Sequence, residues 1–242
     1  MNYLIFDVET IPDLDYGRRF LNLNGLDNED IGRAMFFQQQ QKTGKEFLPL
    51  YLQKVISISV LTDAEDALEL KSLAGNGDDE KLIIQSFYNT LEEEDYCLVT
   101  WNGLLFDLPV LNYRALFNQV DASSYWQKES WHIDVKDSLS GHHPTGQGSL
   151  DEVSKGLGFP GKINLQGNQV WDYYLEGNRE GISNHCDFDV FNTYLVFLKY
   201  QVMIGKLSED QLSSKLKQFR IMLKDTDEEH FEVFLKRWEE QS

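Results

Sequence analysis

The sequence predicts an α/β fold, and three observations support it. First, the uncharged bulky run Tyr3–Phe6 is typical of a strand that is buried on both faces. Second, residues 54–61 alternate in strand fashion and precede a further strand at 67–73, which predicts a hairpin. Third, apolar residues recur with helical period over 82–91, before an apolar strand at 96–100. Strand, hairpin, helix and strand in this order indicate a sheet with helical connections.

The segments between these elements are polar. Residues 13–48 contain scattered glycines and predict an irregular insertion, with short helices possible at 14–22 and 29–40. A charged turn at 63–66 closes the hairpin, and residues 75–80 break the pattern and cap the following helix.

The second half of the chain predicts mainly helices. Its expected elements are, in order, a loop or short helix at 118–130, a short strand at 131–135, an exposed glycine-rich loop at 141–148, helices at 149–157 and 169–176, and a long helix from 182 to 203. The adjacent His142 and His143 lack the spaced partners of a metal site, so we interpret them as loop residues.

Composition is typical of a globular protein. The chain has 242 residues, 41% of them hydrophobic and 13% aromatic, which suits one large domain, alone or with a small appendage. Because no apolar run approaches the roughly 18 residues of a membrane span and no basic residues precede the first apolar run, we expect a cytoplasmic protein without a membrane segment. Cys97 and Cys186 are then expected to be reduced, and they form no zinc site.

The net charge of −18 argues against a tight nucleic-acid binder, because such proteins usually carry a basic patch. Part of the excess lies in residues 225–240, where seven acids outnumber Lys236 and Arg237, which is typical of a solvated helix face. Carboxylates of a metal site also count as negative here, although a bound metal neutralises them. The charge therefore does not exclude an enzyme that holds a few nucleotides through metal.

Asp7 and Glu9 follow the first strand at a spacing of two, so both side chains leave one face of an extended backbone. A carboxylate pair at the end of a core strand is a rigid oxygen platform for Mg²⁺ or Mn²⁺. The alternative, equally supported by this stretch, is that the two acids are polar residues at a strand exit and that Thr10–Pro12 begins a loop.

Two later segments also offer acids near expected sheet ends. Asp107 follows Asn102 and Phe106 after the 96–100 strand, where α/β sheets bind ligands. The alternative for Asp107 is a helix N-cap two residues before Pro109. In the long helix, His185 and Asp189 lie one turn apart on one face, whereas a lone histidine on a helix is usually structural.

Together these segments resemble the DEDD superfamily of 3′–5′ exonucleases. Within it the chain is most similar to the predicted exonucleases related to the proofreading domain of family B DNA polymerases, over about residues 2–205. The resemblance is carried by Phe6-Asp7-Val8-Glu9-Thr10, by Asn102 through Phe106-Asp107-Leu108-Pro109, by His185 through Asp189-Val190 with Thr193-Tyr194, and by Phe47-Leu48-Pro49, Ile133-Asp134, Ser149-Leu150-Asp151-Glu152 and Leu157-Gly158-Phe159-Pro160-Gly161-Lys162.

The resemblance implies a ribonuclease H-like mixed sheet flanked by helices, with an inserted irregular segment after the first strand and extra C-terminal helices. We accordingly expect an exonuclease domain at 1–205 and an acidic helical extension at 206–242. One position departs from the pattern. The family B group has a tyrosine four residues before the last aspartate, and the sister branch has a histidine five residues before it; this chain has His185 in the tyrosine register and Asn184 in the other.

The implied function is a metal-dependent 3′–5′ exonuclease that acts on the 3′ end of single-stranded or frayed DNA or RNA through two divalent ions, Mg²⁺ or Mn²⁺. Asp7, Glu9, Asp107 and Asp189 would hold the metals, with Asp7 bridging them, and His185 would orient or deprotonate the attacking water. We expect Thr10, Trp101, Asn102 and Phe106 to contact the substrate, with core packing as the alternative for Phe106. Two other functions remain open: a non-catalytic nucleic-acid-binding or interaction module, and a hydrolase of small oligonucleotides.

Overall fold

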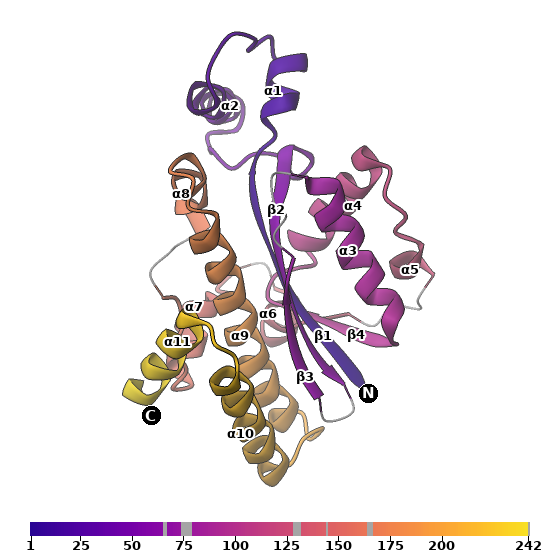
Figure 1. The fold of residues 1–242 in the computed structure, drawn as a ribbon, viewed down its shortest axis with the longest axis vertical. Coiled ribbons are helices and arrows are strands. Elements are labelled where there is room, and N and C mark those ends of the chain that lie inside the picture. Colours follow the sequence, from indigo (N-terminus) through magenta and orange to yellow (C-terminus); the bar gives the residue numbers. More distant parts are fainter. Residues whose placement is uncertain (65–66, 74–78, 128–131, 144, 164–166, 242) are drawn as a thin grey trace.

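A five-stranded mixed sheet lies at the centre of the computed structural model, which describes residues 1–64, 67–73, 79–127, 132–143, 145–163 and 167–241 (Figure 1). The strands are β1 (Asn2–Pro12), β2 (Gln53–Ala64), β3 (Ala67–Ser72), β4 (Tyr96–Thr100) and β5 (His132–Asp134), in the spatial order β3-β2-β1-β4-β5. The β2–β3 hairpin and β1 are antiparallel, whereas β1, β4 and β5 are parallel. The structure thus confirms the predicted α/β fold with a mixed sheet.

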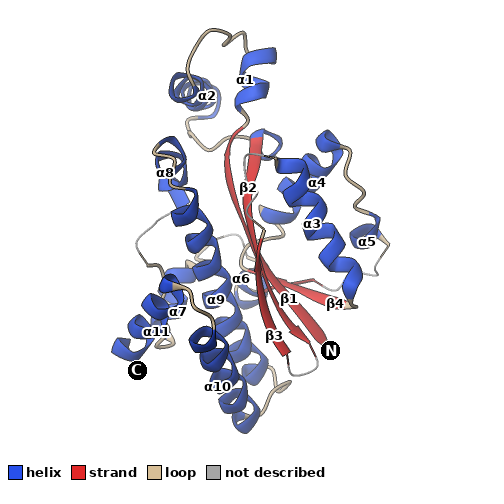
Figure 2. Cartoon of the chain, viewed as in Figure 1, coloured by secondary structure: helices blue, strands red, loops and turns tan. Residues whose placement is uncertain are grey.

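Helices cover both faces of the sheet (Figure 2). One face packs against α3 (Glu80–Glu93) and α4 (Asp107–Asn118), followed by the short α5 (Ser123–Trp126). The other packs against the long α9 (Arg179–Met203). Around α9 lie α6 (Val135–Leu139), α7 (Leu150–Gly156), α8 (Val170–Leu175), α10 (Glu209–Asp225) and α11 (Glu229–Gln241). The predicted helices at 149–157 and 169–176 are confirmed as α7 and α8.

Strand β1 positions its carboxylates by alternation. Leu4 and Phe6 enter the core on the α3 and α4 side, whereas Ile5 enters the core on the α9 side. Because side chains two apart share a face, Asp7 and Glu9 face α9. Strand β4 pairs with β1 only from Asn2 to Ile5, so both acids lie beyond the end of β4.

Strand β1 is longer than the sequence indicated. Residues Thr10–Pro12 continue the pairing with β2 after a register irregularity between Glu9 and Thr10. The interpretation of Thr10–Pro12 as a loop is therefore wrong. Pairing with β2 holds these residues in the strand, a long-range contact that local turn propensity cannot report.

The insertion is more helical than expected. It contains α1 (Leu14–Phe20), α2 (Asn28–Thr43) and a 3₁₀ turn at Leu50–Leu52, and it lies beyond the far ends of β1 and β2 (Figure 1). The side chains of Asp13 and Asp27 cap the two helices, and Gly44 ends α2 in the left-handed conformation at φ 77°. The two short helices that the sequence suggested are thus present, and α2 is longer.

A buried ion network fixes the insertion to the helical layer. Arg114 of α4 contacts Glu80 of α3 at 2.5 Å and Asp13, the N-cap of α1, at 2.6 Å. All three side chains are buried, and mutual hydrogen bonding compensates for the loss of hydration.

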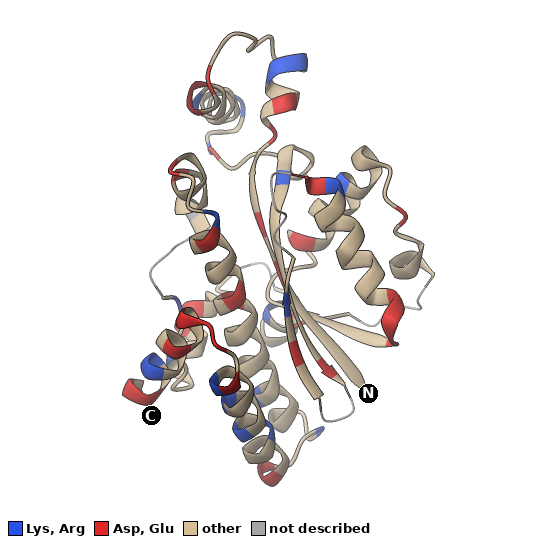
Figure 3. Ribbon diagram, viewed as in Figure 1, with Lys and Arg blue, Asp and Glu red and all other residues tan. Residues whose placement is uncertain are grey.

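The C-terminal helices share the core of the sheet. Phe219 of α10 and Phe231, Phe234 and Trp238 of α11 are buried in the same cluster as α9. The opposite faces of α10 and α11 are polar and exposed, and acidic and basic residues are interspersed along both helices (Figure 3). A division of the chain at residue 205 stays a prediction.

The remaining expectations concern loops and cysteines. Residues 65–66 of the expected hairpin turn, 75–78 of the helix cap, Trp131 and Pro144 lie outside the described residues. Helix α9 begins three residues earlier than predicted. Cys97 and Cys186 are free and buried, as expected. Among the described helices, none is both long and apolar enough to cross a membrane.

Candidate active site

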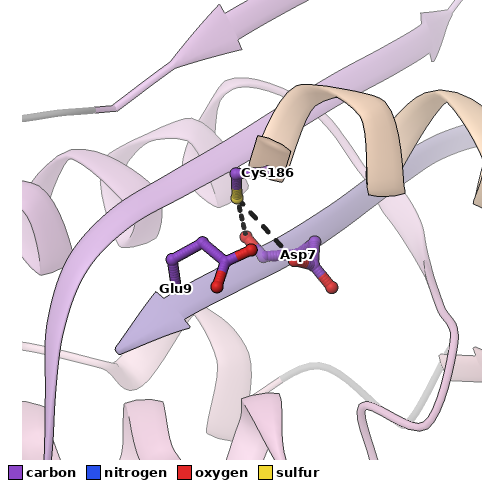
Figure 4. Close-up of side chains that lie close together, drawn as sticks. All are labelled: Asp7, Glu9 and Cys186. Carbon is purple, nitrogen blue, oxygen red and sulfur yellow. Dashed lines mark hydrogen bonds between the residues drawn. The ribbon is translucent and has the colours of Figure 1, made fainter. Parts of the chain in front are cut away.

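The site begins with the two acids of β1 and the first turns of α9. Asp7 is partly buried and Glu9 is 7% exposed, and the thiol of Cys186 points at Asp7 from α9 (Figure 4). The Cys186 Sγ lies 3.3 Å from the backbone oxygen of Asp7 and 3.8 Å from its Oδ2. Sequence analysis did not assign Cys186 to the site, although it directly follows His185 on the helix that carries Asp189.

Asp107 reaches the same strand from the other side. Its Oδ1 accepts a hydrogen bond of 3.1 Å from the backbone N–H of Val8, which lies between the two acids of β1. Since β4 ends before this point, the carboxylate takes the place of a strand partner for that N–H. The interpretation of Asp107 as the helix N-cap is wrong, because Phe106 is the N-cap and Asp107 is the first residue of α4.

His185 and Asp189 of α9 complete the group opposite Glu9. The His185 Nε2 lies 3.6 Å from Glu9 Oε1 and 3.9 Å from Asp189 Oδ2. Both ring nitrogens of His185 and the Asp189 Oδ1 are buried without a hydrogen-bond partner among the described residues. Polar atoms in this state are costly unless a ligand or solvent satisfies them.

Lys162 is a site residue that the sequence analysis missed. Its Nζ lies 3.6 Å from Asp189 Oδ2. The loop that carries it is held in place because Asp151 accepts the Lys162 N–H at 2.7 Å and Asn192 bonds both backbone groups of Gly161. The sequence contained a hint of this role, because Lys162 is the last residue of one of the segments that resemble the exonuclease group.

The electrostatics of the site favour a bound cation. Burial raises the pKa of Asp7 well above its ordinary value, and repulsion from Asp107, Asp189 and Glu9 adds to the effect, which Lys162 partly opposes. Burial and repulsion from Asp189 likewise raise the pKa of Glu9 well above normal. Burial raises the pKa of Asp107 to about 7, against the opposing effect of its backbone hydrogen bonds.

His185 responds to the same environment in the opposite direction. Burial lowers the pKa of its imidazole below the usual 6.5, and the nearby Asp189 only partly compensates. The neutral ring is therefore the favoured form at neutral pH.

These residues fit divalent metal ions. Four carboxylates face one another on β1, α4 and α9, and the donor atoms of Glu9, His185 and Asp189 all lie within 4.8 Å of one another. Without a cation, that many carboxylates in one place repel each other, and the buried orphaned atoms named above lack partners. Asp7, Glu9, Asp107 and Asp189 could thus hold the metals, and their role as ligands stays a prediction.

A large pocket opens beside the carboxylates. It has a volume of about 730 Å³ and runs from Glu9 to the insertion and α8. Three of the four expected substrate residues line it, namely Thr10, Asn102 and Phe106. The fourth, Trp101, is partly buried and packs against the core on the α9 side.

The walls of this pocket are aromatic. Phe47 packs against Phe106 with ring centroids 5.9 Å apart, and Phe36 packs against Trp171 at 6.4 Å. All four rings line the pocket. Asn102 also lines this pocket. Its backbone has a φ of 75°, and its N–H donates a hydrogen bond of 3.0 Å to Asp134 Oδ1.

Comparison with known proteins agrees with this picture. Residues 45–238 match a family model described as a predicted 3′-5′ exonuclease related to the exonuclease domain of PolB. The match includes Asp107, His185 and Asp189 and begins after Asp7 and Glu9. No curated protein matches the sequence.

One solved structure shows the similarity in fold, and a second is more distant. The family B DNA polymerase from the hyperthermophilic archaeon Pyrobaculum calidifontis is 17% identical, with a TM-score of 0.58 over 84% of this chain and 24% of that chain. E. coli Exonuclease I in complex with a 5cy-dT13 oligonucleotide is 14% identical, with a TM-score of 0.40 over 90% of this chain and 43% of that chain. The chain thus spans about a quarter of the polymerase and less than half of Exonuclease I. Since the family model covers most of the sequence, the chain belongs to the family of predicted 3′–5′ exonucleases related to the exonuclease domain of PolB.

Proposed function

We propose that the protein is a metal-dependent 3′–5′ exonuclease that removes nucleotides from single-stranded or frayed 3′ ends. The observation that carries the proposal is the convergence of Asp7, Glu9, Asp107 and Asp189, where burial, with repulsion between acids added to it, raises the pKa of Asp7, Glu9 and Asp107. A buried cluster of four acids seldom serves protein stability alone, whereas hydrolysis of a phosphodiester by two metal ions requires such a cluster.

Each carboxylate has a distinct place in this proposal. Asp7 interacts with all three other acids and would bridge two Mg²⁺ or Mn²⁺ ions, with Glu9 and Asp189 on one ion and Asp107 reaching the other mainly through water. Bound metal supplies an activated water on one side of the phosphodiester and stabilises the leaving 3′ oxygen on the other. The general-base role of His185 stays a prediction.

Lys162 would contact the phosphate itself. Its side chain is 30% exposed and its ammonium group lies next to Asp189, so it can contact an unesterified phosphate oxygen as negative charge develops. A further pocket of about 300 Å³ is lined by Lys162 together with Lys236, Arg237 and Glu240 of α11, so that cations outnumber acids in it. In a chain with a net charge of −18, this group of cations beside the carboxylates is the place where the upstream phosphates of a strand would lie.

The aromatic pocket would receive the terminal nucleotide. Its volume of about 730 Å³ lies within the usual range for small-molecule sites. Phe47, Phe106 and Trp171 offer ring faces on which any base can stack, a mode that serves single strands without sequence preference. A paired terminus would have to fray before its last base could enter.

The experiment is Mn²⁺-dependent shortening of a 5′-labelled oligonucleotide, with DNA and RNA tested in parallel. We expect a ladder of shortened products from the parent and none from Asp7→Ala, while Asp225→Ala, which removes an exposed acid from the end of α10, behaves as the parent. Equal, metal-independent loss in all variants would indicate a contaminating nuclease. No activity on DNA, RNA or dinucleotides would refute the proposal and favour a non-catalytic module, and activity on dinucleotides alone would favour a small-oligonucleotide hydrolase.

A further inference from the structure

His185 stands in the metal site without any of the partners that a structural histidine requires. Its side chain is 1% exposed, and both ring nitrogens lack a hydrogen-bond partner among the described residues. A buried imidazole usually donates from one nitrogen and accepts at the other. The Nε2 atom instead points at the oxygens of Glu9 and Asp189.

The distances in this group are somewhat longer than those between neighbouring ligands of one ion. In an octahedral complex with bonds of about 2.1 Å, neighbouring ligand atoms lie about 3.0 Å apart and opposite ones about 4.2 Å apart. A tetrahedral site with bonds of about 2.0 Å gives about 3.3 Å. The observed separations of Nε2 from Glu9 Oε1 and Asp189 Oδ2, 3.6 and 3.9 Å, exceed the distances between neighbouring ligands by about 0.3–0.9 Å, so these side chains would close in by that amount on a bound ion.

We propose that His185 is a direct metal ligand, and that Glu9, His185 and Asp189 form a mixed nitrogen and oxygen site that prefers a transition-metal ion such as Mn²⁺ over Mg²⁺. The inference deepens the proposed function and rests on it, because the same carboxylates are expected to bind the catalytic metals. Imidazole nitrogen is a ligand for transition metals, whereas Mg²⁺ prefers oxygen ligands and bound water.

His185 also borders a pocket. This pocket has a volume of about 210 Å³, and Asn184, Tyr173 and His230 line it as well. Metal-bound histidines usually donate their second N–H to a carboxylate, a carbonyl oxygen or water, and this pocket is polar and large enough for water. Because Nδ1 itself is buried, a water that hydrates Nδ1–H would have to enter from this pocket when Nε2 binds metal.

This assignment differs from a base role in a way that spectroscopy detects. A base that acts through water leaves its nitrogen outside the first coordination sphere, whereas a ligand nitrogen couples directly to the unpaired electrons of Mn²⁺. Electron spin echo envelope modulation of the Mn²⁺-loaded full chain therefore reports the bond without any turnover.

We expect directly coordinated ¹⁴N modulation in the parent, replaced by a ¹⁵N pattern when the protein carries ¹⁵N-histidine. The labelling arm needs no substitution, so it remains decisive if a variant at this buried position does not fold. His185→Gln should lose the signal and weaken Mn²⁺ binding by about tenfold or more in calorimetry, with a smaller effect on Mg²⁺. His143→Gln, an exposed loop histidine, serves as the matched control and should match the parent.

Two outcomes would overturn the inference and remain separable from the proposed function. Mn²⁺ that binds to the parent without histidine coupling would exclude His185 as a ligand and leave the carboxylate site intact. Failure of the parent to bind Mn²⁺ at all would remove both the inference and the proposed function.

Discussion

Replacing Asp107 with asparagine should stabilise the protein while it destroys the site. The pKa of the Asp107 carboxyl is about 7, compared with its usual 3.8. At 1.36 kcal/mol for each pKa unit, ionisation of this buried acid above pH 7 opposes folding of the metal-free protein by at most about 4 kcal/mol. Asparagine keeps an oxygen that can accept the hydrogen bond from Val8, so Asp107→Asn removes the charge and little else.

The sign of the effect depends on pH. Between about pH 3.8 and 7 the folded protein binds a proton at Asp107 that the unfolded chain does not, so stability contributed by the protonated acid is lost as the pH rises through that window. We therefore expect Asp107→Asn to raise the free energy of unfolding by about 1–4 kcal/mol at pH 8 and to change it little at pH 4.

Urea denaturation with EDTA at both pH values measures this difference. Asp225→Asn removes an exposed acid and serves as the control. Added Mn²⁺ should reverse the order at pH 8, because metal stabilises the parent and has fewer ligands in the variant. If Asp107→Asn is no more stable than the parent at pH 8 without metal, burial of the ionised Asp107 carboxylate does not oppose folding and the electrostatic reasoning fails.

Three further predictions concern other parts of the molecule. Arg114→Met should lower the free energy of unfolding by about 3–5 kcal/mol, because it leaves Glu80 and Asp13 buried and unpaired, and a urea midpoint equal to that of the parent would contradict this. Phe47→Ala should raise KM for a single strand about fivefold or more, because it removes a ring on which a base can stack. Phe37→Ala, which removes an exposed ring of α2, should leave KM unchanged. Equal KM values for both variants would exclude stacking at Phe47. The double variant Lys236→Gln and Arg237→Gln should bind oligonucleotides more weakly, and the slope of log affinity against log salt concentration should become shallower by about 1.4. The control variant Lys217→Gln with Lys224→Gln on α10 should keep the slope of the parent. An unchanged slope in both variants would show that α11 contacts no phosphate.

The sequence predicted what local patterns report. Hydrophobic period identified β4, α3 and α9, and the spacing of Asp7 and Glu9 correctly placed both on one face. These features depend on neighbours in the chain, which a single sequence contains.

Long-range contacts account for what was missed. Asp107 looked like a helix cap because only folding reveals that Val8, 99 residues away, offers it an unpaired N–H. Lys162 and Cys186 were missed for the same reason. The loop that carries Lys162 and the turn of α9 that carries Cys186 come close to the acids of β1 only in the folded protein. The turn propensity of Thr10–Pro12 predicted a loop, whereas pairing with the distant strand β2 makes this segment part of β1.

The aromatic pocket is assembled from two sources. Phe36 belongs to α2, before the part of the chain that matches the family model, whereas Phe47, Phe106 and Trp171 lie within it. The acids that would take part in cleaving the phosphodiester lie on β1, α4 and α9, and none of them belongs to that helix. Evolution could therefore exchange or reshape α2 and alter which 3′ ends are accepted, while the chemistry of cleavage stays the same.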